Sequence, residues 1–177
     1  MEVNFFGVVN VTRAAIRTFR TANELVGGRV LQVSSIGGQR GMSTFSFYSA
    51  SKFAVEGFTE CLSKEMKPEW DIHLTCIEPG AFRTEWAGHS MAFGEIEQPA
   101  YDHIDVARLT KEMNGRQSGD PIKGACVFWD LAKLENPPLR VVLGSDAQRG
   151  IANKIQEYSD HYLDPKWKSF AARTDFK

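Results

Sequence analysis

Three residues in the first third of the chain have the types and the spacing of an acid–base centre. Tyr48 and Lys52 are four residues apart, so on a helix their side chains would share one face, one turn apart. A phenol is a poor base at neutral pH, but a nearby ammonium stabilises the phenolate and makes the pair a usable general acid and base. Ser35 ends an apolar run thirteen residues before Tyr48, where its hydroxyl can donate a hydrogen bond to a carbonyl oxygen that gains negative charge.

Each of these residues also has an ordinary structural interpretation. A Tyr/Lys pair at this spacing is common on solvated helix faces, and a lone Ser after an apolar run is commonly a turn residue. The order of the segments favours chemistry: a strand comes first, then Ser35, then a Gly-containing loop, and then the helix with Tyr48 and Lys52.

The elements that must position these residues alternate along the chain. Apolar residues recur every three or four positions in five segments, which predicts helices over residues 2–25, 46–67, 100–114, 120–135 and 145–158. Short β-branched runs predict buried strands at 29–35, 72–80 and 140–144. The alternation predicts an α/β fold, a partial Rossmann-like doubly wound parallel sheet with three visible strands and flanking helices. The residues after the last helix read as a polar tail.

The segment VLQVSSIGGQRGMSTFSFYSASKFAVEGF, residues 30–58, resembles the active-site segment of the short-chain dehydrogenases/reductases. The resemblance implies that Ser35 orients the substrate carbonyl and that Tyr48 is the catalytic acid and base. It implies that Lys52 favours the phenolate and binds the nicotinamide ribose. VNFFG, at residues 3–7, resembles the family motif that contributes a fourth catalytic residue, so Asn4 would support a proton relay through a bound water. On its own, an Asn near a helix start would be a capping residue.

EPGAFRT, residues 78–84, resembles the family's Pro-Gly segment after the next strand. Pro79 and Gly80 would let the backbone approach the nicotinamide, and Thr84 would hydrogen-bond its carboxamide. The implied cofactor is NAD or NADP, of which only the nicotinamide end is recognisable here. The implied reaction is hydride transfer between the cofactor and a small-molecule carbonyl or alcohol.

The loop and helices at about 85–120 correspond to the substrate-binding insertion of this family. Four residues of this segment are candidates for a partly apolar pocket wall, although core packing explains them nearly as well: Trp86, Met91, Phe93 and Tyr101.

The family's first strand, Gly-rich turn and pyrophosphate-binding helix have no counterpart in this sequence. Gly27-Gly28 precedes a strand, where the fingerprint should follow one, and IGGQRG at 36–41 opens the loop after Ser35. We therefore expect residues 1–177 to form a single domain that corresponds to the C-terminal part of the fold. We expect it to bind dinucleotide weakly and, because its first strand lacks an inner neighbour, to be poorly soluble as a monomer.

Other functions remain open on the residues alone. The chain can instead be a catalytically silent fragment that acts only in dimerisation, or the product of a truncated gene model. The helices at 2–25 and 46–67 correspond to a common subunit interface of the family, which implies a homodimer or homotetramer. An epimerase or dehydratase with the same Tyr/Lys pair is less favoured, because little chain follows the last strand. A hydrolase is weaker still, because no G-x-S-x-G elbow is present.

Composition excludes several other classes of protein. The 177 residues are 42% hydrophobic and carry a net charge of −1, which suits one globular domain and offers no basic field for nucleic acid or an anionic membrane. The three cysteines form no CxxC pair and the four histidines share no ligand-like spacing, so no metal site is expected. No apolar run reaches the length of a membrane span and no leader is evident, so a cytoplasmic location is expected.

Overall fold

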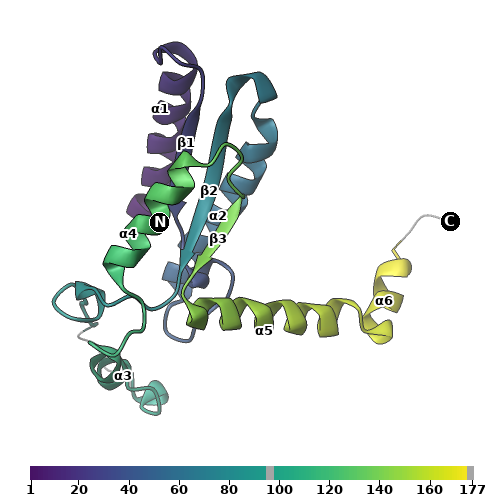
Figure 1. Cartoon of the computed structure of the whole chain (residues 1–177). Helices are drawn as coiled ribbons and strands as arrows, with labels where there is room; N and C mark the ends of the chain where they lie inside the picture. Colours follow the sequence, from purple (N-terminus) through teal and green to yellow (C-terminus); the bar gives the residue numbers. More distant parts are fainter. Residues whose placement is uncertain (95–97, 175–177) are drawn as a thin grey trace.

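A computed structural model describes residues 1–94 and 98–174 of the chain, with a three-stranded parallel sheet between layers of helices (Figure 1). The strands are β1 (Gly28–Val33), β2 (Ile72–Pro79) and β3 (Arg140–Leu143), in the order β1-β2-β3. Gly28 pairs with Ile72, and Cys76 pairs with Arg140. The predicted α/β class and the three parallel strands are confirmed.

The helices agree with the prediction in number up to the last strand but differ at their ends. A π-helical segment, η1 (Glu2–Gly7), leads directly into the first of six α-helices in the described residues. These are α1 (Val8–Thr21), α2 (Ser46–Glu65), α3 (Val106–Met113), α4 (Pro121–Lys133), α5 (Ser145–Tyr162) and α6 (Pro165–Ala172).

Two helix boundaries correct the sequence prediction. The helix expected from residue 100 begins only at Val106, because the Asp105 side chain caps it by accepting from the backbone N–H of Arg108 at 2.8 Å. The residues after the last predicted helix, expected to be a polar tail, contain α6. Asp164 caps that helix by accepting from the N–H of Lys166 at 2.8 Å, and Pro165 occupies the first helical position.

The two faces of the sheet differ in character. On the α4 side, an apolar core forms around Ile77, Leu131 and Leu143. On the side of α1 and α2, Gln32 of β1 is buried and bridges the two helices. Its Nε2 donates to Thr12 Oγ1 at 3.2 Å, and its Oε1 accepts from Thr59 Oγ1 at 2.8 Å. Polar contacts therefore dock the two helices to the sheet on this face.

The strand β1 lies at an edge, with β2 its only paired neighbour among the described strands. Apolar side chains are exposed on η1, α1 and α2, with Val3 82%, Val11 70% and Phe47 89% exposed. At the opposite end of the molecule α5 extends away from the sheet and leads into α6 (Figure 1). None of the helices described here is both long and apolar enough to cross a membrane.

Candidate active site

Ser35 lies two residues after the end of β1 and caps the short turn η2 (Ile36–Gly38). Its Oγ accepts a hydrogen bond from the backbone N–H of Gly37 at 3.0 Å, which fixes the side chain, and the residue is buried. Among the described residues no acceptor faces the Ser35 hydroxyl proton, so this proton is available to an oxygen placed beside it.

Tyr48 and Lys52 lie one turn apart on α2, as the spacing predicts. The Lys52 Nζ is 5.8 Å from the centre of the Tyr48 ring and donates to the backbone carbonyl of Val33 at 2.9 Å. Burial lowers the pKa of Lys52. The ammonium is therefore anchored at the carboxyl end of β1, two residues before Ser35.

Gly37 lies between the Ser35 and Tyr48 side chains. A β-carbon at Gly37 would lie 3.0 Å from Cε1 of Tyr48 and 3.4 Å from Oγ of Ser35. The fold thus brings Ser35, Tyr48 and Lys52 together at the end of one strand, with glycine as the residue that permits the close approach.

Asn4 lies in η1 and contacts a different side of α2. Its Nδ2 donates to Ser51 Oγ at 3.2 Å, and Ser51 Oγ donates to the backbone carbonyl of Tyr48 at 2.7 Å. The contacts of Asn4 lead to the Tyr48 backbone rather than to its phenol. The proton relay assigned to Asn4 therefore stays a prediction. Its place in a π-helix is a feature that often accompanies functional sites.

Pro79 is the last residue of β2, and Gly80 and Thr84 follow that strand. The Gly80 N–H donates to Leu143 O at 2.8 Å, and a β-carbon at Gly80 would lie 2.4 Å from Oδ2 of Asp146. That same Asp146 oxygen accepts from the Ala81 N–H at 2.8 Å. Glycine is needed here because the Asp146 carboxylate packs against the turn. Thr84 caps the next short turn, its Oγ1 accepting from the Trp86 N–H at 3.3 Å.

Two open cavities lie near these residues. One, of about 240 Å³, is mostly apolar and is bordered by Pro79, Thr84, Phe128 and Leu143 among others. The other, of about 290 Å³, lies between residues 43–45 and α3. None of the four predicted wall residues lines either cavity.

Those four side chains lie elsewhere. Trp86 stacks on Phe45 with ring centroids 5.8 Å apart, and Tyr101 is 64% exposed. The cavity of about 290 Å³ is bordered by Leu109 and Met113 of α3 among others. Asp105 is the N-cap of α3, and this capping signal in the sequence would have predicted where the helix begins.

Sequence reasoning also overlooked several charged residues behind the site. Asp146 holds the turn after β2, and Glu56, Glu78 and Arg140 form a contact cluster between α2 and the sheet. The signal for Glu78 was present, because a carboxylate inside the apolar strand IHLTCIEP has to be buried and therefore partnered.

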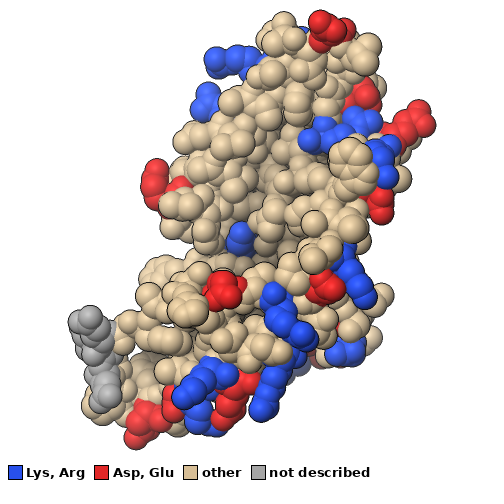
Figure 2. All heavy atoms as spheres, turned by 60° about the vertical axis from the view of Figure 1, so that its left-hand side comes forward, with Lys and Arg blue, Asp and Glu red and all other residues tan. Residues whose placement is uncertain are grey.

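The molecular face drawn in Figure 2 has no patch in which all charged side chains are of one sign. Figure 2 shows acidic and basic side chains interspersed around broad uncharged areas. The described residues contain no group of three or more His, Cys, Asp or Glu that could hold a metal ion.

Comparisons with known proteins agree with this architecture. A family model described as short chain dehydrogenase matches residues 1–93, more than half of the chain. A Schizosaccharomyces pombe protein described as an uncharacterized oxidoreductase is 37% identical over 161 residues, 90% of this chain and 54% of that protein. A 3-ketodihydrosphingosine reductase of Bacteroides thetaiotaomicron is 35% identical over 175 residues, 97% of this chain and 63% of the relative.

A solved structure extends the likeness to the whole fold. A short-chain dehydrogenase from Streptomyces avermitilis has a TM-score of 0.82 and 33% identity, over 99% of this chain and 62% of that chain. This chain spans only 54% and 63% of the lengths of the two curated relatives above. The family match includes the segment with Ser35, Tyr48 and Lys52. On this evidence the chain belongs to the short chain dehydrogenase family.

Proposed function

We propose that the chain acts as a nicotinamide-dependent oxidoreductase that interconverts a carbonyl and an alcohol. The observation that carries this proposal is that Ser35 and Tyr48 meet at Gly37, while Lys52 binds the Val33 carbonyl at the carboxyl end of β1. A hydroxyl donor, a phenol and an ammonium are the groups that such a reaction needs, and family membership supports the same reaction class.

In this proposal Ser35 and Tyr48 act on the substrate oxygen. Ser35, oriented by the Gly37 N–H, donates its free proton to the carbonyl oxygen and stabilises the negative charge that develops there. Tyr48 gives its phenolic proton to that oxygen during reduction and takes it back during oxidation. Lys52 stabilises the phenolate that Tyr48 becomes when it has given up the proton.

The residues present suit the nicotinamide end of NAD or NADP. Lys52 uses one N–H on Val33 and has two more donors for ribose hydroxyls. The apolar cavity of about 240 Å³ beside Pro79 and Thr84 suits one face of a flat ring, with the Thr84 hydroxyl in place for a carboxamide. When bound, the cofactor supplies or accepts the hydride.

The substrate in this proposal is a small molecule with an apolar group next to its carbonyl. The cavity of about 290 Å³ is bordered by Phe45, Leu109 and Met113, and Phe45 lies against Tyr48 with ring centroids 6.2 Å apart. An apolar substituent in this cavity would bring the attached carbonyl toward the phenol. Desolvation of that substituent would supply binding energy.

A subunit interface through α1 and α2 is a second proposal, and it has its own observation. Val3 of η1, Val11 of α1 and Phe47 of α2 are largely exposed, and large exposed apolar patches commonly mark protein contacts. Association through this surface is compatible with catalysis and with a silent role in dimerisation.

The function is tested by following hydride transfer directly. Reduced cofactor carrying deuterium at C4, as NADH and as NADPH, is mixed with a panel of apolar ketones and aldehydes, and the alcohols are analysed by mass spectrometry. We expect one deuterium on the former carbonyl carbon of at least one product. A folded chain that yields no deuterated alcohol with any pair would favour the silent fragment.

A further inference from the structure

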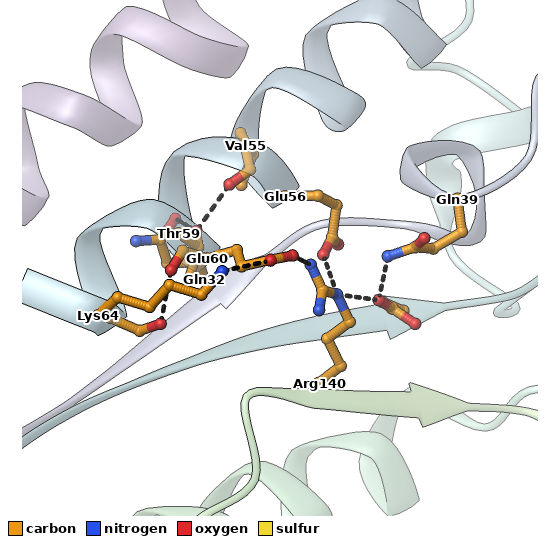
Figure 3. Close-up of polar contacts among 10 residues, drawn as sticks. Gln32, Gln39, Val55, Glu56, Thr59, Glu60, Lys64 and Arg140 are labelled. Carbon is orange, nitrogen blue, oxygen red and sulfur yellow. Dashed lines mark hydrogen bonds and ion pairs between the residues drawn. The ribbon is translucent and has the colours of Figure 1, made fainter. Parts of the chain in front are cut away.

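A buried cluster of charged residues lies behind the candidate site, between α2 and the sheet (Figure 3). Arg140 of β3 donates from Nε to Glu56 Oε2 at 3.0 Å and from Nη2 to Glu60 Oε2 at 2.8 Å. Its Nε is also 3.7 Å from Oε1 of Glu78 in β2. Glu56 and Glu78 are 4% and 1% exposed, so both carboxyl groups depend on partners within the protein.

The cluster reaches the loop that carries Ser35. Gln39, immediately after η2, donates from Nε2 to Glu78 Oε1 at 2.8 Å. Gly38 packs on the other side of the cluster, since a β-carbon there would lie 3.1 Å from Cγ of Glu56 and 3.1 Å from the carbonyl oxygen of Lys52. The loop therefore has two anchors, one in β2 and one in α2, and Arg140 lies between these elements.

The position of the cluster relates it to the chemistry. Glu56 follows Lys52 by one helical turn, and Glu78 directly precedes Pro79, which ends β2 and borders the apolar cavity. Gln39 is the fourth residue after Ser35. Burying charged groups costs desolvation free energy, and apolar residues of similar volume often hold a helix on a sheet equally well. The charged cluster is therefore not required for packing alone.

We propose that Glu78 is a positioning residue: by accepting a hydrogen bond from Gln39, it holds the Ser35 loop in place relative to Tyr48 and Lys52. Glu56 and Arg140 support Glu78 in this role. The positioning proposal rests on the proposed function only in one respect, namely the catalytic role given to Ser35. The positioning itself has an observable, because the Gly37 N–H donates to Ser35 Oγ and the Gly38 N–H to Ser35 O at 2.9 Å. Exchange of these two amide protons with solvent reports whether the loop is held.

The experiment is amide hydrogen exchange by NMR on the whole chain without ligand. Gln39→Ala removes the donor to Glu78, and Gln39→Glu puts a carboxylate opposite it. The double variant Gln39→Glu/Glu78→Gln restores the pair with donor and acceptor exchanged. Gln156→Ala is the matched control, because it removes a Gln–carboxylate hydrogen bond of 2.7 Å on the exposed surface of α5.

We expect protection of the Gly37 and Gly38 amides to fall about tenfold in both single Gln39 variants and to recover in the double variant. The β2 amides and the Gln156→Ala protein should stay at wild-type protection. Equal loss throughout β2 would show that the cluster only stabilises the fold. Unchanged protection in Gln39→Ala, or no recovery in the double variant, would equally overturn the proposal.

Two features keep the test decisive. Glu78→Ala removes the acceptor for Gln39 and should lower the protection of the Gly37 and Gly38 amides as Gln39→Ala does, so it decides the matter if a Gln39 variant does not fold. The readout needs neither cofactor nor substrate. A positive result in a protein without turnover would therefore reject the proposed function and leave the positioning intact.

Discussion

At the scale of single residues, the site depends on how closely the chain passes Gly37. Its amide fixes Ser35, and its missing side chain leaves room for the Tyr48 ring. The Lys52 ammonium reaches the same region from α2 and is held by the Val33 carbonyl. Three short-range contacts therefore set the relative positions of the hydroxyl, the phenol and the ammonium.

Gly37→Ala tests this crowding. Its β-carbon would lie 3.0 Å from Cε1 of Tyr48, so we expect the ring to shift, the rate of carbonyl reduction to fall about tenfold and stability to fall by about 1 kcal/mol. Gly57→Ala is the control, because Gly57 lies in α2 with open space around it and should gain about 0.5 kcal/mol from higher helix propensity. Equal rates and melting temperatures in the two variants would contradict the crowding at Gly37.

At the scale of elements, α2 carries most of the proposed chemistry, and charged groups fix it to the sheet. Arg140 of β3 contacts Glu56 and Glu60 of α2 and Glu78 of β2, and Cys76 lies on the same strand as Glu78. Burial raises the pKa of Glu78 to about 7, and the neighbouring Glu56 carboxyl acts in the same direction. Burial also raises the pKa of Cys76 to about 12, so its thiol is neutral near pH 7.

The pH dependence of stability should report Glu78. With a folded-state pKa near 7 and an ordinary value of 4.5, the folded chain binds more protons than the unfolded chain across this range. The free energy of unfolding should therefore fall as pH rises from about 5 to 7, by up to about 1.4 kcal/mol per pH unit. Urea titrations across this range should show the slope in the wild type and a flatter profile in Glu78→Gln.

Glu60 is the internal control for that titration. Hydrogen bonds from Lys64 and Arg140 lower the pKa of Glu60 to about 2. Its contribution to stability is therefore lost only as pH falls below about 4.5, outside the Glu78 range. A Glu78→Gln protein with the full wild-type slope between pH 5 and 7 would show that another group is responsible.

The elements also show how far sequence could reach. The strands were predicted to within two residues, because β-branched runs and the Gly and Pro residues after them are local signals. The Tyr48–Lys52 geometry followed from helical spacing alone. The missed helix α6 carried the same Asp-Pro start as α4, so Asp164-Pro165 was a readable signal.

Other parts could not be derived locally. Glu56, Glu78 and Arg140 meet only because β2 and β3 pair in register and α2 crosses that face. The contact of Asp146 with Gly80 likewise joins two distant segments. Trp86, Met91, Phe93 and Tyr101 were the candidates for a pocket wall, whereas residues 43–45 and α3 border the cavity of about 290 Å³. The residue types predicted the chemistry of the site, but only tertiary contacts determine which residues surround it.

At the scale of the whole molecule, the edge strand β1 and the helix α1 both expose apolar side chains. Val33 at the end of the edge strand is 50% exposed, and Val11 of α1 is 70% exposed. Exposed apolar side chains beside an open strand edge favour association. Sedimentation velocity over a concentration series should show a dimer or a larger assembly.

Val11→Glu should shift that equilibrium toward monomer by about tenfold or more in dissociation constant, because a carboxylate would be buried in the contact. Ile122→Glu, which changes a 77% exposed residue on α4, should leave it unchanged. A wild-type chain that sediments as a monomer at every concentration would contradict the proposed interface.

Turnover by Tyr48→Phe tests the central claim most directly. The variant keeps the ring but removes the proton that the substrate oxygen needs, so we expect the rate of carbonyl reduction to fall about 100-fold or more while the melting temperature is kept. Tyr162→Phe, which changes a 71% exposed tyrosine on α5, is the matched control and should retain full activity. A Tyr48→Phe protein that reduces carbonyls at the wild-type rate would contradict the account.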